Sequence, residues 1–163
     1  MVALGTAWVH RSPSLLGART GINFVSDTRP VQFGGFAGIA LPDPESHDEQ
    51  LTFHDTPSVH FSRNTAAATA RIAVCVNADS VPTLAGYLTN LDLACSQVRY
   101  VKNGTRVRWS GRSNNPREYL ILVVTPTRPG VATVDRVTYD YEQESGRSGV
   151  DESPTFAYTI KAS

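Results

Sequence analysis

Val98-Arg99-Tyr100-Val101-Lys102-Asn103-Gly104-Thr105-Arg106-Val107-Arg108-Trp109 is the stretch that carries the strongest local signal for the fold. Apolar and polar side chains alternate on both sides of Asn103-Gly104, as is typical of half-buried β-strands. Asn-Gly between two such runs favours a two-residue type I′ turn, because both residues tolerate positive φ. The pattern therefore predicts a β-hairpin that pairs Tyr100 with Val107, Val98 with Trp109, and Arg99 with Arg108.

Further strands are indicated on both sides of this hairpin. Residues 119–124 form a continuous apolar run, which predicts a central strand buried on both faces. Residues 69–77 and 133–141 alternate, and a last strand is expected over 156–160. Residues 51–54 and 59–62 also alternate around Thr56-Pro57-Ser58, which predicts a second hairpin with Phe53 opposite Phe61 and His54 opposite His60. Residues 22–41 are interpreted as one or two irregular strands.

One segment changes period. Ser80 is suited to cap a helix that has Pro82 in its first turn. Apolar residues then recur at helical spacing, namely Val81, Leu84, Leu88, Leu91, Cys95 and Val98. The spacing predicts one helix over about 80–97.

Together these elements predict an all-β fold, an antiparallel β-sandwich of jelly-roll-like type with seven to nine strands and one helix. The chain has 163 residues, which suits a single core. We expect an N-terminal arm at 1–21 and one β-sandwich domain at 22–163. The early break at His10-Arg11-Ser12-Pro13 argues against a secretion signal.

The net charge argues against partners that attract the protein through its overall field. Fifteen basic and fifteen acidic side chains cancel, so no global field attracts nucleic acid or a membrane surface. No apolar run is long enough to span a membrane. Cys75 and Cys95 allow one disulfide, but the sequence does not indicate whether it forms. No nucleophile-elbow, P-loop or dinucleotide motif occurs, so we expect neither enzymatic activity nor a cofactor.

Histidines and acids are concentrated between residues 43 and 60. If His54 lies opposite His60, the two imidazoles form a weak candidate metal site. The spacing matches no ligand motif, so exposed polar residues on a loop and an outer face are the simpler interpretation.

Candidate assembly contacts come from two places. The polar face of the predicted hairpin carries Arg99, Arg106 and Arg108, which suit ion pairing within or between subunits, with Asp140 and Glu142 as suitable acids. Nucleic-acid contact is the weaker alternative because the net charge is zero. In the arm, Trp8 with Arg11 is suited to anchor in a pocket, either on its own domain or on a neighbour.

Two stretches resemble the jelly-roll coat proteins of small icosahedral viruses, most of all those of the tymovirus type. The first starts at Asp79-Ser80-Val81-Pro82-Thr83-Leu84 and runs from Tyr87 to Val98. The second starts at Tyr119-Leu120-Ile121-Leu122 and runs through Pro126, Pro129 and Thr133 to a terminal strand. The resemblance implies a jelly roll without a strongly basic arm. Fewer residues separate the helix from the central strand than that fold uses.

These observations favour a self-assembling structural protein, most concretely a virion component such as a coat, decoration or tail protein. We expect its partners to be further copies of itself and other virion proteins, and its location to be the virion or the host cytoplasm. The alternative is a β-sandwich module that binds a carbohydrate or protein ligand through its loops. A metal-dependent enzyme at His54 and His60 is the third hypothesis.

Overall fold

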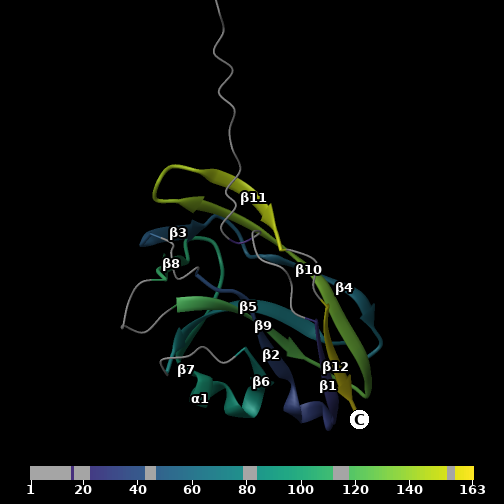
Figure 1. Ribbon diagram of the computed structural model, residues 1–163. Coiled ribbons are helices and arrows are strands. Elements are labelled where there is room, and N and C mark those ends of the chain that lie inside the picture. Colours follow the sequence, from purple (N-terminus) through teal and green to yellow (C-terminus); the bar gives the residue numbers. More distant parts are fainter. Residues whose placement is uncertain (1–15, 17–22, 43–46, 79–83, 112–117, 154–156) are drawn as a thin grey trace, which may run out of the picture.

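The computed structural model describes residues 16, 23–42, 47–78, 84–111, 118–153 and 157–163, which form two β-sheets packed face to face (Figure 1). Sheet A contains β1 (Asn23–Arg29), β3 (Glu49–Phe53), β4 (Ser58–Asn64), β8 (Arg106–Trp109), β10 (Gly130–Gln143), β11 (Ser148–Glu152) and β12 (Ala157–Ala162). Sheet B contains β2 (Gly35–Ala40), β5 (Thr69–Asn77), β6 (Ala85–Tyr87), β7 (Cys95–Tyr100) and β9 (Glu118–Thr125). The expected all-β, sandwich-like fold is confirmed, with more strands than predicted.

The long strand β10 organises sheet A. Its two edges hold β12 and β11 on one side and β4 and β3 on the other, all antiparallel to it. The main path of the sheet runs β1-β12-β10-β3-β8, and β1 pairs with β12 in parallel. Sheet B has the order β6-β2-β9-β5-β7, so β9 lies at its centre and β7 at one edge.

The main core lies between the two sheets. Its largest side chains from sheet A include Trp109, Tyr139 and Tyr141, and those from sheet B include Ile72 and Leu122. Along β10 the predicted alternation is confirmed, because Val137, Tyr139 and Tyr141 are buried while Arg136 and Glu142 are exposed. Burial raises the pKa of the Tyr139 hydroxyl above its ordinary value, so this phenol stays neutral in the core.

A second apolar cluster covers the opposite face of sheet B. Phe36, Ala73, Tyr119, Ile121 and Val123 point away from the main core, yet they are buried. They are covered in part by Leu88 and Leu91, from η2 (Leu88–Asn90) and α1 (Leu91–Ala94). The continuous apolar run of β9 is therefore explained as predicted: it is buried on both faces.

The helical segment is much shorter than its sequence pattern predicts. A short helix is present, but α1 spans only Leu91–Ala94, and Cys95 already begins β7. Before it, Ala85–Tyr87 forms β6 by pairing with β2, and residues 79–83 lie outside the described part of the chain. Of the predicted apolar side, Cys95 is buried and Leu88 and Leu91 are half-buried, but Leu84 is exposed. Pairing with the two neighbouring sheet strands takes the place of a long helix.

The predicted hairpin at 98–109 is wrong. β7 pairs with β5 in sheet B, whereas β8 pairs with β3 in sheet A. Asn103-Gly104 does form a turn, in which the Thr105 N–H donates to the Lys102 carbonyl oxygen at 3.0 Å. Gly104 has φ +80, but Asn103 is not among the positive-φ residues, so the turn has type II rather than type I′ geometry. The turn thus carries the chain from one sheet to the other.

The second predicted hairpin is also wrong. β3 and β4 do not pair with each other; both lie along the same edge of β10 and run in the same direction. Phe53 is opposite Tyr141, and Phe61 is opposite Val134. Residues 54–57 therefore interrupt one long edge instead of reversing the chain, and His54 is not opposite His60.

Of the N-terminal arm, the structure describes Leu16 alone. Leu16 is buried in the main core, and its backbone N–H donates to the Tyr141 hydroxyl at 3.3 Å. Trp8 and Arg11 lie outside the described residues. Among the described residues, no helix has the length and apolar character needed to cross a membrane.

Candidate functional site

The three arginines of the predicted site lie in two different environments. Arg99 projects from β7 toward the gap between the sheets, where its Nη2 lies 2.6 Å from Glu118 Oε1. The other oxygen of Glu118 accepts a hydrogen bond at 2.6 Å from the backbone N–H of Arg108 in β8. The Glu118 carboxylate therefore links sheet B to sheet A. The expected ion pairing exists at Arg99, but its acid is Glu118, not Asp140 or Glu142.

Arg106 and Arg108 lie on the solvent side of sheet A. The Arg108 guanidinium comes within 3.9 Å of Asp48 Oδ2, but both side chains are more than half exposed. Such a pair contributes about 0–1 kcal/mol. Within the described residues Arg106 has no ion pair. The side chains of Arg106 and Arg108 are therefore accessible to a partner, whereas the Arg99 side chain is paired with Glu118 of its own chain.

The two candidate metal ligands are separate. His54 lies between Asp140 and Glu142, with ring nitrogens 3.3 Å and 3.4 Å from their carboxylate oxygens. His60 instead has its Nδ1 2.6 Å from Asp135 Oδ1. Each imidazole has acids from β10 as neighbours, and the described residues contain no group of three or more ligands suited to a metal ion. The sequence-based metal site therefore has no geometric support among these residues.

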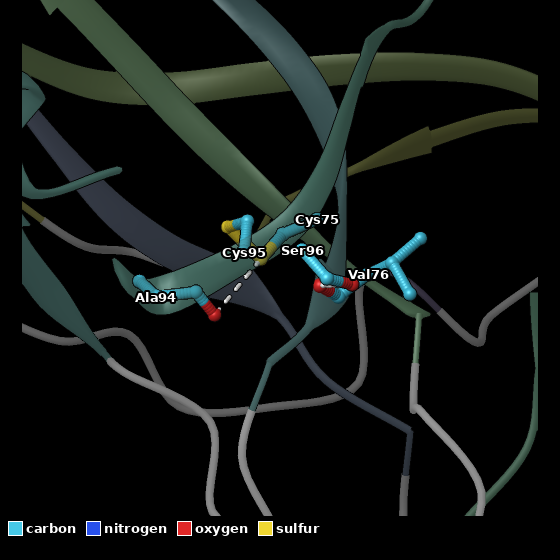
Figure 2. Close-up of a disulfide and its surroundings, with 5 residues drawn as sticks. All are labelled: Cys75, Val76, Ala94, Cys95 and Ser96. Atoms are coloured by element: carbon cyan, nitrogen blue, oxygen red, sulfur yellow. Dashed lines mark hydrogen bonds between the residues drawn. A yellow bond between two sulfur atoms is a disulfide. The ribbon is translucent and has the colours of Figure 1, made fainter. Parts of the chain in front are cut away.

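A disulfide between Cys75 and Cys95 ties β5 to the start of β7, with a Cα–Cα distance of 5.3 Å (Figure 2). The bond is buried, and Cys75 Sγ lies 3.9 Å from the Ala94 carbonyl oxygen. Next to it, the Ser96 hydroxyl donates to the Val76 carbonyl oxygen at 3.2 Å. The bridge fixes the end of α1 against the outer face of sheet B. The sequence left this pairing open, and its signal was an even count of two cysteines.

An open groove lies beside this bridge. It has a volume of about 510 Å³, within the range of small ligand sites. Its lining comes from η2, α1 and β7 and comprises Leu88, Thr89, Leu91, Asp92, Cys95, Ser96, Gln97 and Val98. Leu93, on the same short helix, is 70% exposed. The groove thus combines an apolar floor, one carboxylate and an exposed strand.

Strand β7 is a free edge in the part of the chain that the structure describes. It pairs with β5, and it has no second neighbour in the order of sheet B. At its end, the Tyr100 ring packs under the Arg71 guanidinium, whose carbon lies 3.7 Å from the ring centre. Sequence reasoning missed this surface, because it placed β7 inside a hairpin and most of the groove wall on a long helix.

Comparison with known proteins gives no relative to which the site can be referred. No family model, no curated protein and no solved structure matches the chain.

Proposed function

We propose that the protein is a self-assembling structural protein, most concretely a virion component such as a coat, decoration or tail protein. The observation that carries the proposal is the groove along the edge of β7 that has no neighbour among the described strands, bordered by the exposed Leu93. An unpaired strand edge is a template for pairing with another chain, and apolar surface beside it adds a favourable contact. This surface suits contact with another chain, as assembly requires.

Charge on the other sheet supports the same proposal. Arg106 and Arg108 project from sheet A into solvent, and the carboxylates of Asp140 and Glu142 lie beside His54 on the same sheet. Complementary charges of this kind set the register between subunits and exclude wrong partners. Contact of Arg106 and Arg108 with nucleic-acid phosphates is the weaker alternative, because the net charge of the chain is zero.

The disulfide favours a protein that spends part of its life outside a reducing compartment. Bridges such as Cys75–Cys95 persist in oxidising surroundings, which include virion surfaces, and are rare in the cytosol. A virion protein made in the host cytoplasm would acquire the bridge when particles leave the cell. On this proposal the protein has no catalytic role and needs no cofactor.

The test is the size of the untagged full-length protein in solution. Size-exclusion chromatography with light scattering, followed by negative-stain imaging of the peak, should show rings, tubes or closed shells. A single monomeric species across a wide concentration range would contradict the proposal.

A second function is favoured by one observation, the polar side chains Thr89, Asp92 and Gln97 around the apolar floor of the groove. A few polar groups around an apolar surface are also the design of a binding module for a carbohydrate or a protein. That function predicts a monomer with saturable binding of a soluble ligand, measured by calorimetry against a glycan and peptide panel. It also predicts that Gln97→Ala weakens binding without changing the oligomeric state.

A further inference from the structure

We propose that residues 2–9 of one copy bind as an added β-strand along β7 of a neighbouring copy, with Trp8 in the groove. The inference rests on the proposed self-assembly and names the two surfaces that meet. The contact would be a β-augmentation, in which backbone hydrogen bonds supply affinity and a side-chain pocket supplies specificity.

The acceptor is defined by the hydrogen bonding of β7. The Val101 N–H donates to the Ile72 carbonyl oxygen at 2.9 Å, and the register continues with Arg99 opposite Val74. In an antiparallel ladder, backbone groups of alternate residues point to opposite edges. The backbone groups of Val98 and Tyr100 therefore point away from β5, toward the free edge. They can accept and donate the hydrogen bonds of one more strand.

The other edges of the sandwich are protected against such pairing, and β7 is less so. β8 has only four residues and carries Arg106 and Arg108, while β6 has three residues. β1 has an irregularity between Val25 and Thr28, the pairing of β4 with β10 has two irregularities, and β11 carries Asp151 and Glu152. Charges, short length and bulges are the usual protection of edge strands. β7 has six residues, and its one irregularity lies at its start, so that its pairing with β5 is regular from Gln97 to Tyr100. Its single charged side chain, Arg99, is already paired with Glu118.

The donor is defined by the sequence of the arm. Large side chains at Val2, Leu4 and Trp8 alternate with the small residues Ala3, Gly5 and Ala7, and no side chain through Val9 is charged. This alternation places the large residues on one face of an extended strand. Three residues after Trp8, Arg11 supplies a cation, and Asp92 is the one formal charge in the groove lining. Shape and charge therefore both match the groove.

The position of Leu16 favours a neighbouring copy over the same one. Leu16 contacts Tyr141, which pairs with Gly149 in the hairpin of β10 and β11. Figure 1 shows β11 at one end of the molecule and β7 with α1 at the other. Leu16 and the acceptor groove therefore lie toward opposite ends of the described part of the molecule. An arm of one copy and a groove of the next are different surfaces, so the proposed contact is heterologous. Contacts of this kind propagate into rings or filaments.

The test uses two complementary full-domain variants. Deletion of residues 1–9 removes the donor, and Ser96→Arg places a cation in the acceptor groove, where it blocks the strand and repels Arg11. Each variant alone should be monomeric by light scattering. Mixed together, they should form a one-to-one complex, because one retains an intact groove and the other an intact arm. If the mixture stays monomeric although the wild type assembles, the inference is overturned.

Ser62→Arg is the matched control. Ser62 is also exposed on a strand, and its hydroxyl also lies within 3.5 Å of a carbonyl oxygen of the neighbouring strand, but it is on β4 in sheet A. This variant should assemble like the wild type. If both arginine variants lose assembly equally, the groove has no special role and the inference fails.

A peptide measurement covers the case in which Ser96→Arg does not fold. A fluorescent peptide of residues 1–12 is titrated into the protein that lacks residues 1–9, and binding should saturate. A Trp8→Ala peptide should bind about tenfold more weakly, since buried tryptophans dominate interfaces of this kind. Equal binding of both peptides would overturn the role of Trp8 and the inference. A wild-type protein that never assembles would instead overturn the proposed function.

Discussion

The outer faces of the two sheets differ, and the difference explains where the interaction surface arises. On sheet A, outward side chains such as Arg106, Arg136 and Glu142 are exposed to solvent. On sheet B, outward side chains such as Ala73 and Ile121 are buried under a second layer. A solvated face needs only polar residues, whereas an apolar face needs a cover. The cover of η2 and α1 in turn creates the groove beside β7.

The largest expected effect is the loss of the second apolar layer. Phe36→Ala removes a ring that is 1% exposed on the outer side of sheet B, and we expect a loss of about 3–5 kcal/mol in the free energy of unfolding. Guanidinium-chloride unfolding at one protein concentration measures it. On the outer face of sheet A, Arg136→Ala should change the same quantity by about 0.5 kcal/mol or less. Similar losses in both variants would contradict the comparison.

The next effect concerns the bridge that holds the cover. The double variant Cys75→Ala and Cys95→Ala opens a loop with a sequence separation of 20, which predicts a loss of about 3 kcal/mol. The measurement is chemical unfolding with and without reductant. Reductant should weaken the wild type to a similar extent and leave the double variant unchanged. If reductant does not change the denaturant concentration at which the wild type unfolds, the bridge does not contribute to stability.

A smaller effect is expected where the two sheets are joined. Glu118→Gln removes the charge that Arg99 contacts and weakens the acceptor for the Arg108 N–H, and we expect a loss of about 1–2 kcal/mol. Because the pair is partly exposed, added salt should reduce the difference. The variant is compared with the wild type by thermal unfolding at low and high salt. An unchanged midpoint of thermal unfolding at low salt would mean that the link through Glu118 does not stabilise the protein.

The smallest effect is expected on the solvated face. Arg108→Gln removes an ion pair whose partners are 70% and 53% exposed, so the free energy of unfolding should change by about 0.5 kcal/mol or less. The same variant should weaken assembly if Arg108 contacts a neighbouring subunit, which light scattering would detect. A large loss of stability with unchanged assembly would reverse this assignment.

Several strands follow directly from their sequence patterns. The predicted strand at 69–77 is β5 with the same bounds, and the apolar run at 119–124 lies within β9. Alternation is a local property, because it reports which side chains leave water, and it held for β10 as well. The candidate site could be predicted only in part. Arg108 is exposed as expected, but the acid that pairs with Arg99 comes from a strand whose place in the sheet the sequence pattern does not define.

The errors share one cause, which is the choice of partner. Asn103-Gly104 suits a tight turn, but that turn does not decide whether the two flanking strands pair with each other or with strands of different sheets. The apolar spacing around Leu88 and Leu91 is real, but it describes a cover over sheet B rather than a long helix. Alternation along one strand does not define which strand becomes its neighbour, so the same local pattern is compatible with both arrangements.

The sequence by itself determined the all-β class, the faces of the central strands and the neutral charge balance, because these depend on composition and on periodicity along the chain. The tertiary structure alone decided that the chain passes from sheet B to sheet A between β7 and β8. It also decided the Cys75–Cys95 bridge, the link through Glu118 and the groove beside β7. These features join residues that are far apart along the chain. They follow from which strands become neighbours, and that choice minimises the exposed apolar area of the whole molecule rather than of any single segment.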